Sequence, residues 1–481
     1  MKLARTTLVV ATLVTLGTAI PAAATMPAWN DAKSVALPSG AKGIPDGFLP
    51  TLTCVSAGNC EAGGSYTDAN NRVEGLILTE SNGVWTAPTS LKPPAGAAAD
   101  PGVTIYTLSC GAVGDCGAAG SYQDSAGDTL AFYANEVGGT WAPAHQVELP
   151  ANALAKDQNA AIRSIDCPSA GNCSAVGNYD DNNSVSSRDE GFVELEIKGV
   201  WHRATEIAIK GSTNFNPFVA MGQVACASNG RCAAVGSYIN ANDVTEGLVV
   251  DENGNVWDQG QALSLPANAS AFAGATLSEV TCVKDSSCAV FGSYYQRGGA
   301  IEALSAGESH GVWGRAVEVT MPANADTNPH VFLYGFGGIA CASSGNCSVG
   351  GQYEASNGDY EGFLANESNG TWSSAQELSL PSGALSAGKN GGVVALACPA
   401  VGNCRASGAY LDASNHYQAV VVTETNGVWA TGVKVVLPNN ATSVGVDGGI
   451  YSLICSSPSS CLGTGSYLEG TSTYEGFTLA S

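Results

Sequence analysis

Charged side chains are scarce in this sequence. Only 13% of the 481 residues are Asp, Glu, Lys or Arg, while 44% are hydrophobic, so the chain lacks the composition of a disordered protein. Basic residues are scarcer still, since 19 Lys and Arg stand against 42 Asp and Glu, which gives a formal net charge of −23. A surface this acidic repels phosphate backbones and anionic headgroups. Nucleic acid and acidic membranes are therefore poor partners. Cations and neutral glycans remain open as ligands.

Recognisable catalytic motifs are also missing. No Gly-x-Ser-x-Gly elbow, His-Glu-x-x-His motif or phosphate-binding loop occurs. The five histidines do not recur at one position of a repeat: His145, His202, His310, His330 and His416. We therefore favour a protein without catalytic activity. A glycosidase or lyase that assembles carboxylates from distant segments stays open, because sequence spacing does not reveal such a site.

A long apolar run occurs only at the N-terminus. It extends from Leu8 to Ala19, follows two basic residues and precedes the small-residue segment Ala22-Ala23-Ala24. This pattern predicts a cleaved signal peptide over residues 1–24, because the run is too short to cross a bilayer core of ~30 Å. We expect residues 25–481 to form one soluble, secreted, extracellular domain. We also expect it to be monomeric and not inserted in a membrane.

The sixteen cysteines fall into eight pairs, all with the spacing C-x5-C. Successive pairs begin 56 to 59 residues apart, and each repeat also contains one Tyr and one Trp at a constant place. In an exported chain, this regular short spacing predicts eight local disulfides. Metal ligation is the rival interpretation, but periodic His and a second nearby Cys pair are lacking. The predicted disulfides are Cys54–Cys60, Cys110–Cys116, Cys167–Cys173, Cys226–Cys232, Cys282–Cys288, Cys341–Cys347, Cys398–Cys404 and Cys455–Cys461.

Each repeat predicts four short antiparallel strands. Apolar and β-branched runs alternate with Gly, Asn and Asp, and most of the tryptophans follow a turn such as Ser81-Asn82-Gly83, of the type found in hairpins. Repeated four-stranded units indicate the blades of a β-propeller. The first Trp, Trp29, precedes every Cys pair, and no Trp follows the last pair. We therefore predict an all-β, eight-bladed propeller in which the N-terminal strand completes the last blade, since an open stack would leave two unpaired edges.

Several recurrent residues have a structural and a functional interpretation. The Trp and Tyr columns suit sugar stacking, but one residue at the same place in every blade is more simply a packing wedge. Glutamates precede the third turn of seven repeats, where we expect them to accept backbone N–H bonds or to keep the sheet edge soluble. These glutamates are Glu80, Glu136, Glu196, Glu252, Glu308, Glu367 and Glu424.

Two resemblances arise from these motifs. The segment Glu80-Ser81-Asn82-Gly83-Val84-Trp85 and its six relatives resemble the Asp-box hairpin of sialidase-type propellers, although the Asp of that box is generally replaced. The full repeat, with Cys341-Ala342-Ser343-Ser344-Gly345-Asn346-Cys347, Gly351-Gln352-Tyr353 and Asn369-Gly370-Thr371-Trp372, is similar to repeats of secreted actinobacterial proteins of unassigned function. The resemblances imply the propeller fold and export, and neither implies a reaction.

Binding residues are expected where loops depart from the repeat. The Cys loops and the Asn-Gly turns share one face of a propeller, and the other face carries the second-to-third and fourth-to-first connections, which vary. Two of these connections are rich in aromatic residues. They predict a ligand-binding surface. The alternative is that these aromatic side chains only fill space beneath long loops. The residues concerned are Phe215, Phe218, His330, Phe332, Tyr334 and Phe336.

The turns between the second and third strands carry acids and amides. Oxygen ligands at such spacing suit Ca²⁺, and the third repeat offers the best set, Asp180, Asp181 and Asp189. The alternative is that Asp and Asn simply form tight turns. The leading hypothesis is thus a secreted, non-catalytic propeller that binds an extracellular or cell-surface ligand such as a glycan. An extracellular carbohydrate-active enzyme with carboxylates in the central channel and a structural cell-envelope protein are the alternatives.

Overall fold

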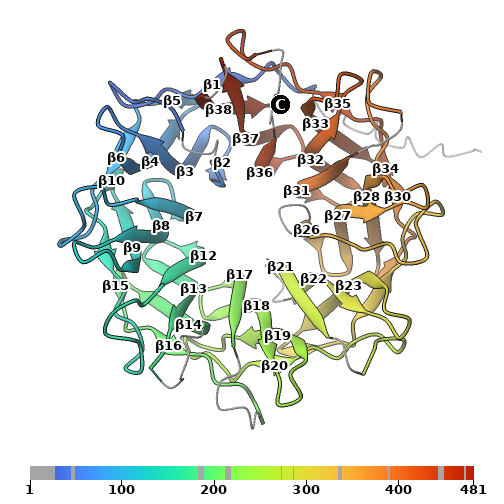
Figure 1. The fold of residues 1–481 in the computed structure, drawn as a ribbon, viewed down its shortest axis with the longest axis horizontal. Coiled ribbons are helices and arrows are strands. Elements are labelled where there is room, and N and C mark those ends of the chain that lie inside the picture. Colours follow the sequence, from blue (N-terminus) through green and yellow to red (C-terminus); the bar gives the residue numbers. More distant parts are fainter. Residues whose placement is uncertain are drawn as a thin grey trace, which may run out of the picture.

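The protein is an eight-bladed β-propeller built around a central channel (Figure 1). The structure is a computed structural model that describes residues 28–44, 49–182, 189–211, 218–271, 274–284, 287–333, 338–386, 390–442, 449–470 and 473–481. In these ranges every regular element is a strand. The described part of the chain therefore holds no helix of the length and apolar character that crossing a membrane requires. The predicted signal peptide, residues 1–24, lies outside the described residues.

Each blade has three long strands and a short outermost one, as the repeats predicted. The innermost strands line the channel: β2 Thr51–Ser56, β7 Thr104–Ala112, β12 Ala161–Ser169, β17 Ala220–Ser228, β21 Ala275–Val283, β26 Gly338–Ser343, β31 Gly391–Ala400 and β36 Ile450–Ser457. The second strands are β3 Asn59–Thr67, β8 Asp115–Gln123, β13 Asn172–Asp180, β18 Arg231–Ile239, β22 Ser287–Tyr295, β27 Asn346–Glu354, β32 Asn403–Leu411 and β37 Ser460–Glu469. The third strands are β4 Val73–Ser81, β9 Thr129–Val137, β14 Asp189–Ile197, β19 Thr245–Asp251, β23 Ile301–Ser309, β28 Tyr360–Ser368, β33 Tyr417–Thr425 and β38 Thr473–Ala480.

The outermost strand is broken into two short pieces in six blades. Both pieces pair with the third strand, on either side of an irregular step that follows the Trp. Short pieces limit the edge that another sheet could join. These pieces are β5 Val84–Trp85 with β6 Thr89–Leu91, β10 Thr140–Trp141 with β11 His145–Gln146, β15 Val200–Trp201 with β16 Thr205–Glu206, β24 Val312–Trp313 with β25 Val317–Val319, β29 Thr371–Trp372 with β30 Gln376–Glu377, and β34 Val428–Trp429 with β35 Val433–Lys434; blade 4 has β20 Gln261–Ala262 and blade 8 has β1 Lys33–Ser34.

The ring closes as predicted, because β1 completes the blade of β36, β37 and β38. Lys33 pairs with Thr478 and Ser34 with Phe477 in antiparallel register. The Ser34 hydroxyl also lies 2.8 Å from the Tyr467 hydroxyl. Blades 1 to 7 begin at β2, β7, β12, β17, β21, β26 and β31, and this closing blade is blade 8 (Figure 1).

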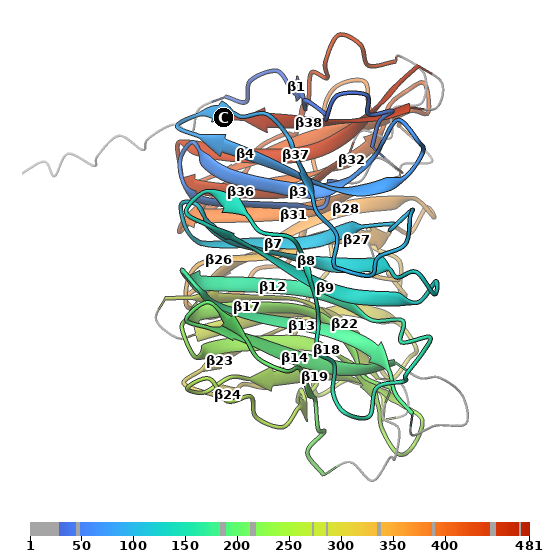
Figure 2. The same cartoon turned by 90° about the vertical axis from the view of Figure 1, so that its left-hand side faces the viewer.

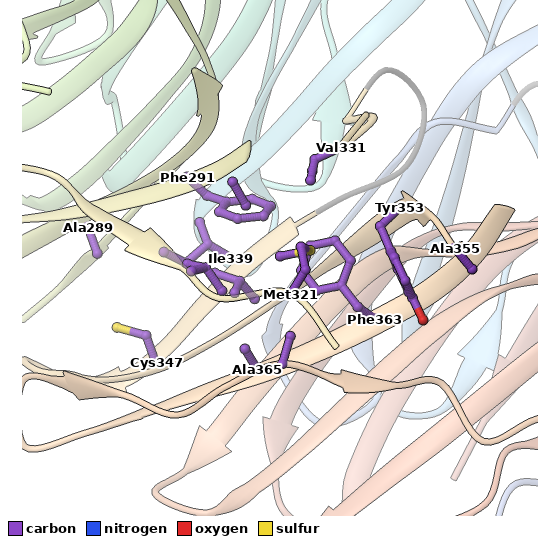
Figure 3. Packing of buried hydrophobic residues seen from close by; sticks show 14 residues of the cluster. Ala289, Phe291, Met321, Val331, Ile339, Cys347, Tyr353, Ala355, Phe363 and Ala365 are labelled. Carbon is purple, nitrogen blue, oxygen red and sulfur yellow. The ribbon is translucent and has the colours of Figure 1, made fainter. Parts of the chain in front are cut away.

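The core is a ring of clusters between neighbouring blades. All eight tryptophans belong to these clusters, one in each. The tyrosine column is buried in all eight blades, so both columns have the packing role that the structural interpretation gave them. Figure 3 shows the cluster between blades 5 and 6, where Phe291 meets the edge of Phe363 and Tyr353 packs beside it.

Side chains of the innermost strands also tie each blade to the next. The Thr107 hydroxyl accepts the backbone N–H of Ile165 at 3.1 Å, and Ser164 accepts that of Val224 at 3.2 Å. Gln223 Oε1 likewise accepts from Val280 at 2.6 Å. Each bond satisfies a donor at the inner edge of a sheet, which would otherwise face the channel unpaired.

The disulfide-bearing loops that join the first strand of a blade to the second lie on the same face as the turns that join the third strand to the fourth. This face is here called the Cys-loop face, and Figure 2 shows the ring from the side, with connections on two opposite faces. The backbone N–H of Gly83 donates to the carbonyl of Gly58 at 2.8 Å, and five other blades repeat this bond between loop and turn. Gly58 has φ of 73°, and a Cβ there would lie 2.7 Å from the Gly83 nitrogen. Only glycine fits this approach. The opposite face carries the turns from the second strand to the third, here called B–C turns, and the connections from the fourth strand to the first strand of the next blade, here called D–A connectors. We call it the variable face.

All sixteen cysteines form the eight predicted disulfides, and none is free. Each bond joins cysteines six positions apart, so it closes a short loop and removes little entropy from the unfolded chain.

We expect the double substitution Cys110→Ala/Cys116→Ala to lower the free energy of unfolding by about 2 kcal/mol. The measurement is urea denaturation under non-reducing conditions. The Cys398–Cys404 disulfide closes a loop of equal length. The double substitution Cys398→Ala/Cys404→Ala should therefore lower the free energy of unfolding by the same amount. A protein that no longer folds after the loss of one pair would contradict this expectation.

Candidate ligand sites at the axis and on the variable face

A β-bulge in the innermost strand points one residue per blade toward the channel. The register of six innermost strands shifts at the residue four positions before the first Cys, which has no partner on the second strand. A bulge re-aims the side chain of its extra residue. The bulge residues are Tyr106, Arg163, Gly222, Ser278, Val394 and Tyr451.

These residues make the channel asymmetric. Large side chains from blades 8, 2 and 3 face the small residues of blades 4, 5 and 7 across the axis. The space between them is a cavity of about 410 Å³, here called the axial pocket, which all eight innermost strands line. Bulge residues lie near the beginning of their strands, so the pocket is nearer the variable face than the Cys-loop face. No motif in the sequence marked the residues of this pocket in advance.

The bulky wall of the axial pocket combines aromatic rings with a cation. The guanidinium carbon of Arg163 lies 5.5 Å from the ring centroid of Tyr106, a distance at which cation and ring attract one another. The Ser121 hydroxyl donates to the Tyr106 hydroxyl at 3.3 Å, and Ser466 makes the same contact with Tyr451. These bonds fix both phenol groups at the wall.

A carboxyl group lies on the opposite wall. Glu279 is a hydrogen-bond partner of Gln223, whose carbonyl is held by the N–H of Val280. Enclosure by the channel wall raises the pKa of Glu279 to about 7, although the bond with Gln223 opposes this rise. Among the described residues that line the pocket, Glu279 is the one carboxyl group.

A second carboxyl group of the innermost strands, Asp166, has a structural role. It accepts the N–H of Cys226 at 2.7 Å and the hydroxyl of Ser109 at 3.1 Å, so it joins the strands of blades 2, 3 and 4. Burial raises its pKa. Asp166 does not line the axial pocket, so it is not the second carboxylate that a glycosidase would place opposite Glu279.

The predicted aromatic surface is divided between blades. Phe215, Tyr334 and Phe336 lie outside the described residues. Phe218 is 37% exposed and precedes β17 of blade 4, whereas Phe332 is 38% exposed and precedes β26 of blade 6. The described members therefore belong to two separate connections, and their role in binding stays a prediction.

Around Phe332, three aromatic rings form an ordered group. His330 Nδ1 lies 2.7 Å from Glu354 Oε2, and its Nε2 lies 3.0 Å from the Asn328 side chain. The His330 ring stacks with Phe332 at 6.4 Å between centroids, and Tyr360 meets Phe332 edge-on at 5.5 Å. This blade-6 aromatic group, His330, Phe332 and Tyr360, holds Phe332 partly exposed on the variable face.

The predicted calcium ligands do not converge on one point. Asp180 and Asp189 are cross-strand partners, and Asn159 donates to Asp180 at 2.7 Å. Burial and the charge of Asp180 raise the pKa of Asp189. Asp181 follows Asp180 directly, so its side chain points to the opposite face of the strand. There, burial and the charge of Asp181 raise the pKa of Glu206. Calcium binding by Asp180, Asp181 and Asp189 stays a prediction.

Other B–C acids and amides are engaged in their own turns. Asp68, Asp124, Asn240 and Asp412 each accept two backbone N–H groups of the same turn through one side-chain oxygen. Arg72 also binds Asp68 at 2.6 Å. Bonds to Arg72 lower the pKa of Asp68 to about 2. In these four turns the acids and amides have the role of turn formers.

The glutamate column differs from the prediction that it keeps the sheet edge soluble. Glu136, Glu196, Glu252, Glu308 and Glu424 are all buried. Several do accept backbone N–H groups, as Glu308 does from Cys288 and Gly311. Their burial follows from the ring, because the neighbouring blade covers the edge that a single repeat would expose.

Comparisons with known proteins name no family for this chain. No family model and no curated protein match the chain. Solved structures similar to it include an ulvan lyase (11% identity, 76% of this chain and 90% of that one, TM-score 0.42), the six-bladed fucose-recognising lectin of Aleuria aurantia (15%, 69% and 98%, 0.32) and Trypanosoma rangeli sialidase (11%, 64% and 52%, 0.31). Likeness at this level carries no argument about function. The resemblance to actinobacterial repeat proteins stays a prediction.

Proposed function

We propose that the chain is an exported, non-catalytic propeller that binds a saccharide of an extracellular or cell-surface glycan in the axial pocket. In this proposal residues 1–24 are cleaved and residues 25–481 form the mature protein. Sixteen paired cysteines are compatible with an oxidising, extracellular environment.

The observation that carries the proposal is the asymmetry of the axial pocket. A pyranose presents an apolar C–H face, which suits an aromatic ring such as Tyr106 or Tyr451. Its hydroxyl groups both donate and accept, so they suit a site with Arg163 as donor and Glu279 as acceptor. A cavity of about 410 Å³ has the size of a small-ligand site. The proposed binding surface also includes the blade-6 aromatic group on the same face.

Binding is favoured over hydrolysis by the number of carboxyl groups. Both common glycosidase mechanisms use two carboxyl groups that flank the scissile bond. The described lining of the axial pocket supplies Glu279 alone. A structural envelope protein is less favoured, because it has no need of such an asymmetric pocket.

The test is a glycan array followed by calorimetry on residues 25–481. We expect Tyr106→Ala and Tyr451→Ala each to weaken binding of the selected glycan about tenfold or more, since each removes a stacking face. Tyr106→Phe keeps the ring and should retain most of the affinity. Phe332→Ala reports separately on the blade-6 aromatic group, and Val84→Ala, an exposed site on the Cys-loop face, is the control. Absence of glycan binding, or affinity unchanged in both Tyr→Ala variants, would refute the axial site.

A further inference from the structure

A carboxamide fills the junction between blades 2 and 3 on the Cys-loop face. The Asn135 amide nitrogen donates to the Glu196 carboxylate, and the Asn135 oxygen accepts from Trp201 Nε1 at 2.9 Å. The junction of blades 6 and 7 repeats the arrangement, with Asn366 between Glu424 at 2.5 Å and Trp429 at 2.9 Å. In both places one amide group binds a carboxylate oxygen of the glutamate and the N–H of the tryptophan together.

The junction between blades 1 and 2 lacks this amide. Thr79 stands directly before Glu80, at the position that Asn135 holds before Glu136, and it donates instead to Glu61 at 2.9 Å. Glu136 and Trp141 are cross-strand neighbours, as Glu196 and Trp201 are. Glu136 Oε2 and Trp141 Nε1 are both buried without a hydrogen-bond partner.

A cleft borders Thr79, Glu136 and Trp141 at this junction. Its volume is about 480 Å³, and Glu61, Glu136 and Trp141 are among its lining residues. Glu136 is only 2% exposed, so its unpaired oxygen is a costly buried acceptor. Leaving such a group unpaired costs about 1–3 kcal/mol.

Three other junctions resolve part of the same problem internally, although Trp257 Nε1 and Trp29 Nε1 are also buried without a hydrogen-bond partner. Between blades 4 and 5, Asp251 accepts from Trp313 at 3.0 Å. Between blades 3 and 4, Ser174 donates to Glu252 at 2.8 Å. Between blades 7 and 8, the Arg405 guanidinium carbon lies 5.2 Å from the Trp29 ring centroid. Among the described residues, a buried Glu oxygen and the Trp N–H of its own blade are both unpartnered only between blades 1 and 2.

We propose that the cleft between blades 1 and 2 binds the acetamido group of an N-acetylated hexosamine. The amide N–H of the ligand donates to Glu136, and its carbonyl oxygen accepts from Trp141 Nε1, as the Asn135 side chain does between Glu196 and Trp201. The remaining cleft receives the sugar ring, whose hydroxyl groups meet Glu61 and Thr140. This site lies on the opposite face from the axial pocket, and the inference does not depend on that pocket.

A metal ion fits the cleft less well. Ligand atoms of Glu61, Cys116 and Glu136 lie within 4.8 Å of one another, but Cys116 is disulfide-bonded to Cys110 and offers no thiolate. Ca²⁺ takes six to eight oxygen ligands. Burial and the charge of Glu136 raise the pKa of Glu61 to about 8, so Glu61 is largely protonated at neutral pH. A cation would also leave the Trp141 N–H unpaired.

The test follows the indole N–H signals of the intact protein by ¹H–¹⁵N NMR, with Trp141→Phe used to assign Trp141. We expect N-acetylglucosamine and acetamide to shift the Trp141 signal downfield in a saturable way, because the indole gains an acceptor. Glucose, which has no amide, should leave it in place. The Trp201 signal is the internal control, since Asn135 already occupies its N–H.

The variant Thr79→Asn supplies the missing carboxamide from the chain itself. Its Trp141 signal should be displaced without ligand, and its affinity for N-acetylglucosamine should fall on the order of tenfold to hundredfold. Tyr106→Ala, in the axial pocket, should leave the Trp141 response unchanged. The proposal is overturned if glucose shifts Trp141 as much as N-acetylglucosamine does, if Ca²⁺ shifts it and the amides do not, or if Thr79→Asn responds like the unmodified protein.

Discussion

The free energy of unfolding should be several kcal/mol larger at pH 5 than at pH 8. Burial raises the pKa of Glu61 to about 8, of Glu279 and Glu302 to about 7, and of Asp251 to about 6. In the unfolded chain these groups titrate near pH 4. Between the two values the folded protein holds protons that the unfolded chain has released, so stability falls as the pH rises through this window. At about 1.4 kcal/mol per pH unit, Glu61 alone accounts for roughly 4 kcal/mol.

The measurement is urea denaturation at pH 5, 6, 7 and 8 and constant ionic strength. Repulsion within so acidic a chain also grows with pH, so the contribution of Glu61 needs a variant. Glu61→Gln removes the titrating group, and it should stabilise the protein at pH 8 and reduce the pH dependence. Glu148→Gln, at an exposed carboxylate, is the control. It should change neither the stability at pH 8 nor the pH dependence of stability. Equal or rising stability from pH 5 to pH 8 would contradict the burial of these acids.

The ring could be predicted from sequence because the evidence for it is repeated eight times. Constant Cys spacing determined the disulfides, and the displaced Trp29 determined how β1 joins β38. The residue pattern within one repeat did not reveal that each blade is covered by its neighbour in the ring. Glu136 and its relatives therefore look like edge residues in the sequence, although they are buried at the junctions.

The candidate sites were harder to predict because their signals are departures from the repeat. Tyr106, Arg163 and Tyr451 stand where the other repeats have Pro, Gly, Ser or Val. An alignment of the repeats would have revealed them. The bulge that turns them toward the channel has no sequence marker of its own. Thr79 is a similar case, since its importance lies in the Asn that two other junctions have in its place, Asn135 and Asn366.

Loss of the N-terminal strand should destabilise the ring more than loss of any one disulfide. Without residues 28–38, β38 becomes an unpaired edge beside the buried Phe477 and Leu479, and an exposed apolar edge promotes aggregation. The single substitution Trp29→Ala should lower the free energy of unfolding by about 3–5 kcal/mol. It removes a partly buried ring that packs against the core cluster of blade 8 and faces the guanidinium of Arg405.

The contribution of this closure is measured by urea denaturation and light scattering of the full-length protein, the deletion variant and Trp29→Ala. Lys33→Ala is the matched control, because its side chain is exposed while its backbone still pairs with Thr478; its effect should stay within about 0.5 kcal/mol. The deletion should lower the urea midpoint and produce oligomers. Closure joins the two ends of the chain, so residues remote from the N-terminus should also lose protection, and amide exchange should quicken in β36 and β37 of the deletion variant. A deletion variant as stable and as monomeric as the full-length protein would mean that β1 contributes no closure energy.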